Sequence, residues 1–391
     1  MISVQEARQI ISDHCHSKKT ELRPLYNANG YTLAEPVYSP VNTPPFDQSA
    51  MDGYAFSFEK WDGKSDLYVT GEVQAGNYFT GNLGPNETIR IYTGACLPPD
   101  ADTVVMQEKV TRTVNTITIN DKELFKSCNV RLQGSQSKKG DIILFKGDCL
   151  TPAAISFLAG TGIDKVKVFS KPIISIIITG KELIKPGLPL TEGKVYESNS
   201  FGLTAALNQL GISPVSVEMT DDNEEEIITA ITSQLQSDII ILTGGVSVGD
   251  YDFAGSALEK CGVKKIFHKV KQKPGKPLYF GIHNQTHVFA LPGNPAAVLT
   301  CFYEYIVPVI SSYTEKNYFK KLKLSLANDF TKKQGLTYFL KGTTNLNSVI
   351  VLNHQESYLM NSFALADCIV ELEEDKVQFR KGDLVDINMI N

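Results

Sequence analysis

Strand and helix patterns alternate between residues 169 and 315, and this order leaves few folds open to that part of the chain. Three apolar runs have the length and composition of buried strands, at residues 173–179, 238–243 and 288–291. Helical patterns occupy residues 198–210, 222–236 and 295–305. Repeated β-α-β order predicts a parallel sheet with helices on both faces. Ligands of such folds bind outside the carboxyl ends of the strands, so we expect the loops there to hold the functional residues.

Capping patterns in the sequence predict where helices begin. Ser3 and Glu6 have capping-box spacing at the start of a helical segment that runs from residue 3 to 16, and Thr151 precedes a second short helix. Asp222 and Glu225 have the same kind of spacing before the helical pattern at 222–236, so we expect them to cap that helix.

The loop after the strand at 238–243 is rich in glycine. Gly244, Gly245 and Gly249 can expose backbone N–H groups that cradle an anion, and Ser247 adds a hydroxyl. Such glycine patterns occur in many turns. Their position at the end of a buried strand, directly before two acids, is what indicates a binding site.

Two acids and a second loop add to this predicted binding site. Asp250 and Asp252 suit Mg²⁺, which takes one or two carboxylates together with phosphate oxygens. A second strand-to-helix connection consists of Pro292, Gly293, Asn294 and Pro295. Such a connection can also hold an anion.

A third loop is basic. Four lysines lie between residues 269 and 277, among them Lys273 and Lys276 around Gly275. They predict a local positive pocket in an acidic protein. A solvated hairpin is the alternative interpretation.

Residues 44–55 have an unusual composition for a core element. Two prolines exclude a helix at the start of the segment. Asp47 and Asp52 lie five residues apart around small residues, and Gly53 permits close approach of the backbone to another surface. This composition is typical of a functional loop on a rigid body, although a tight connection with solvated acids fits equally well.

This stretch resembles the signature of the molybdopterin molybdenumtransferases, which complete the molybdenum cofactor, and of the related C-terminal domain of gephyrin. The family usually has asparagine where Gln48 stands. A second signature segment runs from residue 90 to 98, and its Thr93 falls on a position implicated in the family's active site. The three loops of the α/β region match the family's central domain, and the resemblance covers nearly the whole chain.

The chain departs from the family at several positions. Ser135 and Gln136 replace two acids, and Lys181 replaces the acid before Glu182. Lys341 stands where the family often has an arginine, and a lysine keeps the charge but loses bidentate recognition of an oxyanion.

The resemblance implies that adenylylated molybdopterin and molybdate are the substrates, that molybdenum cofactor and AMP are the products, and that Mg²⁺ is the cofactor. The implied catalytic residues are Asp52, Thr93, Glu182, Asp221, Asp250 and Asp252, with Mg²⁺ on Asp250 and Asp252. The implied substrate-binding residues are Gly244, Gly245, Ser247, Gly249, Lys273, Gly275, Lys276, Pro292, Gly293, Asn294, Pro295 and Ser362. The family also suggests a homodimer in which the other subunit supplies Asp52 and Thr93, with the molybdopterin adenylyltransferase as a candidate partner.

The implied fold class is a multidomain α/β protein. A discontinuous α/β linker domain is expected at 1–45 and 130–168, and a β-rich domain at 46–129. A doubly wound, molybdopterin-binding α/β domain is expected at 169–316, and a small β-barrel at 317–391. The β patterns of the last region alone also fit a sandwich.

Composition makes some classes of function less favoured. A net charge of −5 argues against a nucleic-acid partner. Seven scattered cysteines without a CxxC pair favour a reducing cytoplasm. The N-terminus lacks the hydrophobic region of a signal peptide, and the longest apolar run is too short for a membrane span.

His283 and His287 flank a predicted hairpin turn, where we expect them to be exposed.

Two other classes of function remain open at this stage. A molybdopterin adenylyltransferase or a competence-damage-type nucleotide hydrolase would resemble residues 169–315 only. A non-enzymatic dimeric scaffold, the role that gephyrin takes in receptor anchoring, would tolerate the departures at Ser135, Gln136 and Lys341.

Overall fold

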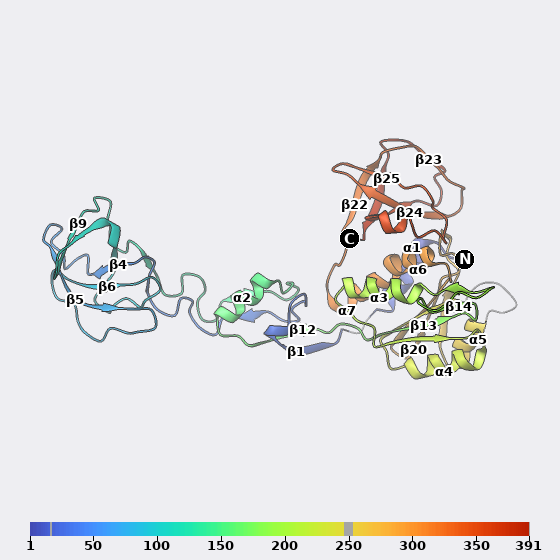
Figure 1. Cartoon of the computed structure of the whole chain (residues 1–391), viewed down its shortest axis with the longest axis horizontal. Coiled ribbons are helices and arrows are strands. Elements are labelled where there is room, and N and C mark those ends of the chain that lie inside the picture. The colour runs from blue at the N-terminus through green and yellow to red at the C-terminus, as the bar shows by residue number, and fades with distance from the viewer. Residues whose placement is uncertain (16–17, 246–252, 391) are drawn as a thin grey trace. The chain divides into compact units, whose positions relative to one another are not determined.

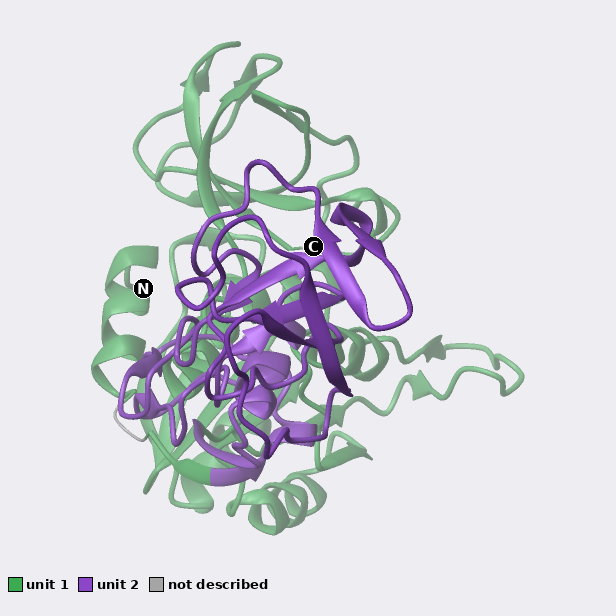
Figure 2. Ribbon diagram, turned by 90° about the vertical axis from the view of Figure 1, so that its left-hand side faces the viewer, with its two compact units in different colours: residues 1–21, 169–391 green, residues 22–168 purple. Residues whose placement is uncertain are grey.

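The computed structural model describes residues 1–15, 18–245 and 253–390. The chain divides into two compact units, one of residues 1–21 with 169–391 and the other of residues 22–168 (Figure 2). The finer four-domain division expected from the sequence stays a prediction.

The first unit contains a six-stranded sheet with the order β16-β13-β17-β21-β20-β18. The strands are β13 (Ile174–Thr179), β16 (Ser216–Thr220), β17 (Ile239–Thr243), β18 (Lys264–His268), β20 (Tyr279–His283) and β21 (Thr286–Leu291). The first four in the sheet order are parallel, and β20 and β18 add an antiparallel edge. Every residue of β13, β17 and β21 is buried, as expected for parallel strands that are covered on both faces. The parallel sheet predicted from the sequence is confirmed.

Helices cover both faces of this sheet (Figure 1). One face packs against α1 (Val4–Asp13), α3 (Asn199–Gln209), α6 (Pro295–Cys301) and α7 (Val307–Thr314), and the other against α4 (Glu224–Gln234) and α5 (Phe253–Lys260). The predicted capping box of Ser3 and Glu6 is confirmed at the start of α1. A π-helical segment, Phe302–Ile306, joins α6 to α7.

The joined helix Pro295–Thr314 is long and apolar enough to cross a membrane by length and composition alone. In the described residues it is the one helix that meets these criteria, and 72% of its most apolar window is buried inside the unit. Such burial is typical of a core helix.

The cap of α4 differs from the sequence prediction by one residue. Asn223, not Asp222, is the N-cap: its side chain accepts a hydrogen bond from the backbone N–H of Glu226 at 3.0 Å and donates one to the Glu226 carboxylate at 2.6 Å. Asparagine and aspartate are about equally good N-caps, so the sequence could not decide between them. Asp222 is therefore left outside the helix and takes no part in its capping.

The hairpin between β20 and β21 is confirmed, but the expectation that His287 is exposed is wrong. His287 is 3% exposed, and its ring stacks on Phe280. One ring nitrogen lies 3.1 Å from the Tyr313 hydroxyl, and the other lies 3.1 Å from the carbonyl of His14. The helices on this face cover the ring, and a local turn pattern cannot reveal that long-range contact.

Burial of His287 predicts an acid-sensitive fold. Desolvation holds the pKa of His287 below its ordinary value of 6.5 in the folded protein. The unfolded chain therefore binds more protons near pH 6, and stability should fall as the pH drops below 6.5. We expect His287→Phe to lose less stability than the parent between pH 7.5 and 5.5, as measured by urea unfolding. Far-UV circular dichroism should follow unfolding, because the one tryptophan, Trp61, lies in the other unit. Equal losses in the two proteins would contradict this assignment.

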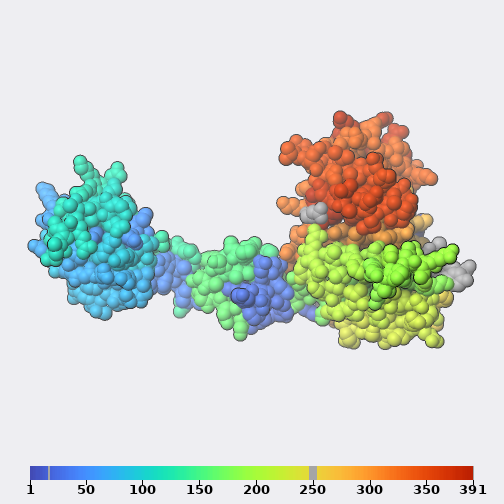
Figure 3. Space-filling model, viewed as in Figure 1, coloured from blue at the N-terminus to red at the C-terminus, as the bar shows by residue number. Residues whose placement is uncertain are grey.

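The C-terminal part of the first unit is a closed five-stranded barrel, which confirms the barrel prediction. Its strands are β22 (Lys321–Leu326), β24 (Thr337–Thr344), β25 (Ser348–Val351), β26 (Cys368–Leu372) and β28 (Leu384–Met389), and pairing of β24 with β26 closes the ring. Figure 3 shows this barrel, in orange and red, stacked on the α/β part of the same unit. The short strand β19 (Gln272–Lys273) pairs with β24, so the lysine-rich loop is attached to the barrel.

The second unit combines a β-rich part with a small helical part. Its six-stranded sheet contains β4 (Gly53–Phe56), β5 (Leu67–Val73), β6 (Glu87–Ile91), β7 (Thr103–Met106), β8 (Val110–Arg112) and β9 (Thr116–Ile119). Short ladders also lie outside that sheet, among them β2 (Val37–Tyr38) with β11 (Ile142–Leu144) and β3 (Gln48–Ser49) with β10 (Val130–Arg131). Thr151 caps α2 (Pro152–Gly160) as predicted, and this helix packs on Leu25 and Leu33.

Candidate functional site

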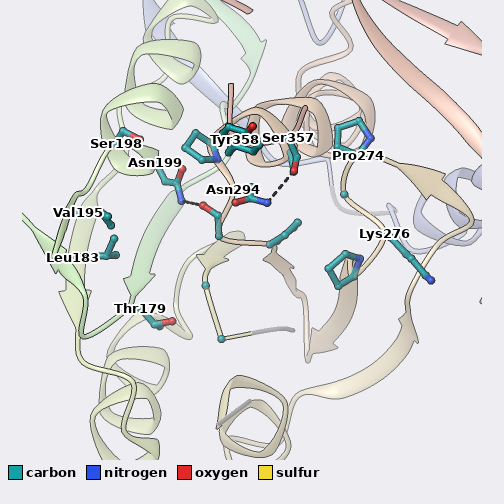
Figure 4. Close-up of a pocket in the computed structure, with 18 of the residues that line it drawn as sticks. Thr179, Leu183, Val195, Ser198, Asn199, Pro274, Lys276, Asn294, Ser357 and Tyr358 are labelled. Carbon is teal, nitrogen blue, oxygen red and sulfur yellow. Dashed lines mark hydrogen bonds between the residues drawn. The ribbon is translucent and has the colours of Figure 1, made fainter. Parts of the chain in front are cut away.

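A cavity of about 950 Å³ opens where β13, β17 and β21 end in the first unit (Figure 4). The register aligns Ile178 with Thr243 and Thr243 with Leu291, so the loops after the three strands begin side by side. A cavity of this size can bury a small organic ligand. The expected residues that line it are Glu182, Gly244, Gly245, Lys273, Gly275, Lys276, Pro292, Gly293, Asn294 and Pro295.

Other expected residues lie elsewhere or outside the described ranges. Ser247, Gly249, Asp250 and Asp252 fall within residues 246–252, which the structure does not describe. Within the described part of the first unit, Asp221 and Ser362 do not line the cavity, and Asp52 and Thr93 belong to the second unit. The lining also includes residues that the sequence analysis did not assign to the site, among them Thr179, Glu197, Asn199, Asp222, Gln272, Ser357 and Tyr358.

Gly244 is required where β17 meets the end of β13. Its φ of +91° lies in the left-handed region, and an added Cβ would lie 2.3 Å from the carbonyl oxygen of Thr179. Only glycine fits such an approach. The chain can therefore turn sharply at the cavity floor and bring backbone groups next to a ligand.

Asn199 contributes a polar atom that has no partner among the described residues. This residue begins α3, and it is 9% exposed. Its Nδ2 donates a hydrogen bond to the carbonyl of Gly293 at 2.9 Å (Figure 4), while its buried Oδ1 is unpaired. An unpaired buried acceptor is costly, so such an atom in a cavity wall points to a ligand that supplies a donor.

Asp222 and Glu182 bring carboxylates to the same cavity. The Oδ1 of Asp222 is buried and unpaired within the described chain. The neighbouring Asp221 is exposed, and its backbone N–H donates to Glu226 at 3.2 Å. Asp222 therefore lines the cavity and Asp221 does not, while the catalytic role that the resemblance implies for Asp221 stays a prediction.

These carboxylates fit a magnesium ion that is shared with a phosphorylated ligand. The described residues contain no group of three or more histidine, cysteine or acidic side chains that could hold a metal alone. Mg²⁺ needs fewer, because it is commonly held by one or two carboxylates together with substrate phosphates and water. The unpaired oxygen of Asp222 is a metal ligand of the right chemistry, and Glu182 lines the same cavity.

The lysine-rich turn forms the basic side of the cavity. The Lys273 ammonium lies 5.3 Å from the centre of the Tyr338 ring, a distance typical of a cation–π contact. The Lys276 side chain runs outward along the edge of the cavity, away from Asn294 (Figure 4). Both lysines are exposed, so they can approach an anion without first breaking a buried ion pair.

Part of the cavity wall comes from the barrel. Ser357 accepts a hydrogen bond from the Asn294 side chain at 2.9 Å (Figure 4), and its carbonyl accepts one from the backbone N–H of Ala296 at 3.1 Å. Tyr358 follows it in the lining. The loop that carries both residues is thereby fixed to the start of α6.

Lys341 and Ser362 support that loop from inside. Lys341 is 4% exposed, and its ammonium donates to the carbonyls of His354, Glu356 and Leu359 at 2.8, 3.2 and 3.2 Å. Burial lowers the pKa of the Lys341 ammonium. The Ser362 hydroxyl also donates to the His354 carbonyl, at 2.7 Å. In this arrangement both side chains hold the protein backbone instead of facing the cavity.

Asp52 and Thr93 lie together in the second unit. One carboxylate oxygen of Asp52 accepts hydrogen bonds from both the backbone N–H and the hydroxyl of Thr93, each at 2.8 Å. These bonds, helped by the charge of Arg90, lower the pKa of Asp52. The signature loop and the turn after β6 therefore present one fixed, ionised carboxylate, which is a polar group suited to contact a ligand.

The residues missed from the sequence carried weak local signals. Asp222 stands next to Asp221, an acid of the same type, and Asn199 looks like an ordinary residue at a helix start. Ser357 and Tyr358 lie far along the chain from the loops that they join. The fold alone brings them to the cavity.

Comparison with known proteins gives consistent results over the whole chain. Residues 2–162 match the family model described as the MoeA N-terminal region (domain I and II), and residues 175–312 match a probable molybdopterin binding domain. Residues 323–390 match the MoeA C-terminal region (domain IV).

Relatives and solved structures agree with these matches. The molybdopterin molybdenumtransferase of Haemophilus influenzae is 34% identical over 402 residues, covering 100% of this chain and 99% of the relative. That of Staphylococcus epidermidis is 32% identical, covering 99% and 95%. A crystal structure of a molybdopterin biosynthesis MoeA protein from Pyrococcus horikoshii is 29% identical and superposes with a TM-score of 0.85 over 100% of this chain and 99% of that one. With matches that run from one end to the other, the chain belongs to the molybdopterin molybdenumtransferase family.

Proposed function

We propose that this protein inserts molybdenum from molybdate into adenylylated molybdopterin, releasing AMP and molybdenum cofactor, in a reaction that requires Mg²⁺. The observation that carries the proposal is the cavity of the first unit, where the carboxylates of Glu182 and Asp222 and the lysines at 273 and 276 line one space. A substrate with both a phosphoric anhydride and a nearby oxyanion needs this combination of charges. The family membership supports the same reaction class.

The residues divide between two tasks in this proposal. Lys273 and Lys276 attract molybdate as exposed point charges. Gly244, Gly245 and the segment from Pro292 to Pro295 offer backbone and small surfaces to the phosphates and the pterin. The unpaired oxygen of Asn199 accepts a hydrogen bond from a donor on the pterin or the ribose.

Asp222 and Glu182 would hold the magnesium ion, with Asp250 and Asp252 as further candidates from the sequence. A bound Mg²⁺ neutralises phosphate charge and polarises the anhydride. The protein side chains hold the phosphates and the oxyanion close together, and in this way they supply the positioning that such a reaction needs.

The place of the second unit in this scheme is also part of the proposal. Asp52 and Thr93 form a rigid polar pair, and we propose that a second subunit of a homodimer presents this pair to the cavity. The protein acts in the cytoplasm and receives its substrate from a molybdopterin adenylyltransferase. If this chain were itself an adenylyltransferase, the regions that match the MoeA family models at residues 2–162 and 323–390 would have no role in its reaction.

AMP release tests the proposal directly. Adenylylated molybdopterin, molybdate and MgCl₂ are mixed with the protein, and AMP is measured by chromatography. We expect AMP to form only when molybdate and Mg²⁺ are both present, and EDTA to stop it. Consumption of ATP with unmodified molybdopterin, in place of AMP release, would instead identify an adenylyltransferase. Protein without either activity would favour the scaffold.

A further inference from the structure

The basic turn of the cavity is built around one buried amide. Gln272 precedes Lys273 and is 1% exposed. Its Nε2 donates hydrogen bonds to the carbonyls of Pro274 and Gly275, each at 3.1 Å. The side chain therefore fills the inside of the turn and holds the backbone between the two lysines.

The other end of this amide is fixed by a helix. The hydroxyl of Tyr305 donates to Oε1 of Gln272, and Tyr305 is 1% exposed. It belongs to the π-helical segment Phe302–Ile306, in the helix that begins at the cavity with Pro295. One tyrosine–glutamine contact thus connects the core helix to the turn that carries the lysines.

The space inside the turn is too tight for another arrangement. A Cβ added to Gly275 would lie 2.5 Å from the Cys301 sulfur and 2.8 Å from Nε2 of Gln272. From outside, the turn is attached to the barrel, because the backbone N–H of Thr337 donates to the carbonyl of Lys271 at 3.0 Å. The position of the turn is therefore set by a few defined contacts, and the Gln272 amide, beside the Cys301 thiol, supplies the hydrogen bonds at 3.1 Å that hold it from inside.

We propose that Gln272 and Tyr305 are a positioning pair that sets where Lys273 and Lys276 meet the molybdate oxyanion. The inference rests on the proposed function, since it takes these lysines as the oxyanion site. Neither residue of the pair needs to touch the substrate. Loss of either partner leaves buried polar groups unpaired, and the turn relaxes to satisfy them with water. The ammonium groups then move away from their place in the cavity.

The affinity for molybdate tests the pair. Isothermal titration of the full-length protein with molybdate gives the dissociation constant, and molybdate dependence of AMP release gives kcat and KM separately. Tyr305→Phe removes only the hydroxyl, and Gln272→Met removes the amide at similar length. We expect each to raise the molybdate dissociation constant and KM about tenfold while kcat falls less than about twofold, since misplaced binding groups mainly weaken substrate binding. The double variant should be no weaker than Gln272→Met alone, because both changes break one unit.

Two further variants separate the possible outcomes. Thr314→Val removes another buried hydroxyl of the same helix, which donates to the Ile310 carbonyl at 2.9 Å, and it should bind molybdate like the parent. If Lys273→Ala weakens molybdate binding but Tyr305→Phe does not, the positioning pair is refuted and the proposed function stands. If Lys273→Ala binds like the parent, the lysine site of the proposed function is refuted. If Gln272→Met does not fold, Tyr305→Phe carries the test, since it deletes a single atom.

Discussion

Replacing Asp222 with asparagine should slow AMP release by on the order of 10²-fold while the fold stays intact. Asp222 lines the cavity, and its Oδ1 is buried without a partner among the described residues. A buried polar oxygen that finds no partner among the described residues is costly, and we expect a ligand to complete it. The variant keeps the shape of the side chain and removes its charge. We therefore expect an unfolding midpoint in urea equal to or above that of the parent.

The adjacent acid supplies a matched control. Asp221→Asn removes the same charge one residue earlier, at an exposed position outside the lining of the cavity. AMP release, measured at saturating molybdate over a series of Mg²⁺ concentrations, should be close to that of the parent in this variant. In Asp222→Asn the Mg²⁺ concentration needed for half-maximal rate should rise. Equal rates in the two variants, or a larger loss in Asp221→Asn, would show that the sequence prediction of Asp221 was right and that the structural assignment of Asp222 was wrong.

Features set by neighbours in the chain could be predicted from the sequence. The strand at β13 and the caps at Ser3 and Thr151 depend on residues within a few positions, and all three are confirmed. The loops after the parallel strands could also be placed at one edge, because parallel strands end on the same side of a sheet. This rule predicted that the Gly244 and Pro292 loops lie at the same edge of the sheet, and both line the cavity.

Features set by distant contacts could not be predicted. Asp221 and Asp222 are adjacent acids, and the sequence does not show that the helix cap is Asn223, directly after Asp222. The hairpin that carries His287 can be predicted from the sequence. The burial of its ring cannot, because it depends on contact with Tyr313 in a helix that is distant along the chain. Lys341 stands where the family often has an arginine, and only the structure shows that its ammonium donates to backbone carbonyls. A charged side chain has the same sequence signature whether it faces a ligand or supports a loop.

Arg8→Met should destabilise the first unit by about 3–5 kcal/mol, the usual cost of removing one partner of a buried ion pair. The Arg8 guanidinium lies 2.5 Å from the Glu304 carboxylate and 2.9 and 3.0 Å from the two oxygens of Glu371. Glu304 is 2% exposed, and both of its oxygens also accept from Asn388 at 2.7 Å. The cluster joins α1, the π-helical segment and two strands of the barrel. Loss of the Arg8 guanidinium leaves the carboxylates of Glu304 and Glu371 close together without a cation.

The dependence on pH distinguishes this mechanism from a simple packing defect. Burial raises the pKa of Glu304, and Arg8 is the main influence that opposes the rise. Without Arg8 the folded protein holds a proton on Glu304 that the unfolded chain releases, so stability should fall as the pH rises. Urea unfolding followed by far-UV circular dichroism should show a larger deficit for Arg8→Met at pH 8 than at pH 5.5, and Glu304→Gln added to it should restore much of the loss. Gln9→Met, on the exposed side of the same helix, should stay within about 0.5 kcal/mol of the parent. A deficit that is the same at both pH values would mean that the lost stability comes from the packing of the Arg8 side chain on Phe339, and not from its charge.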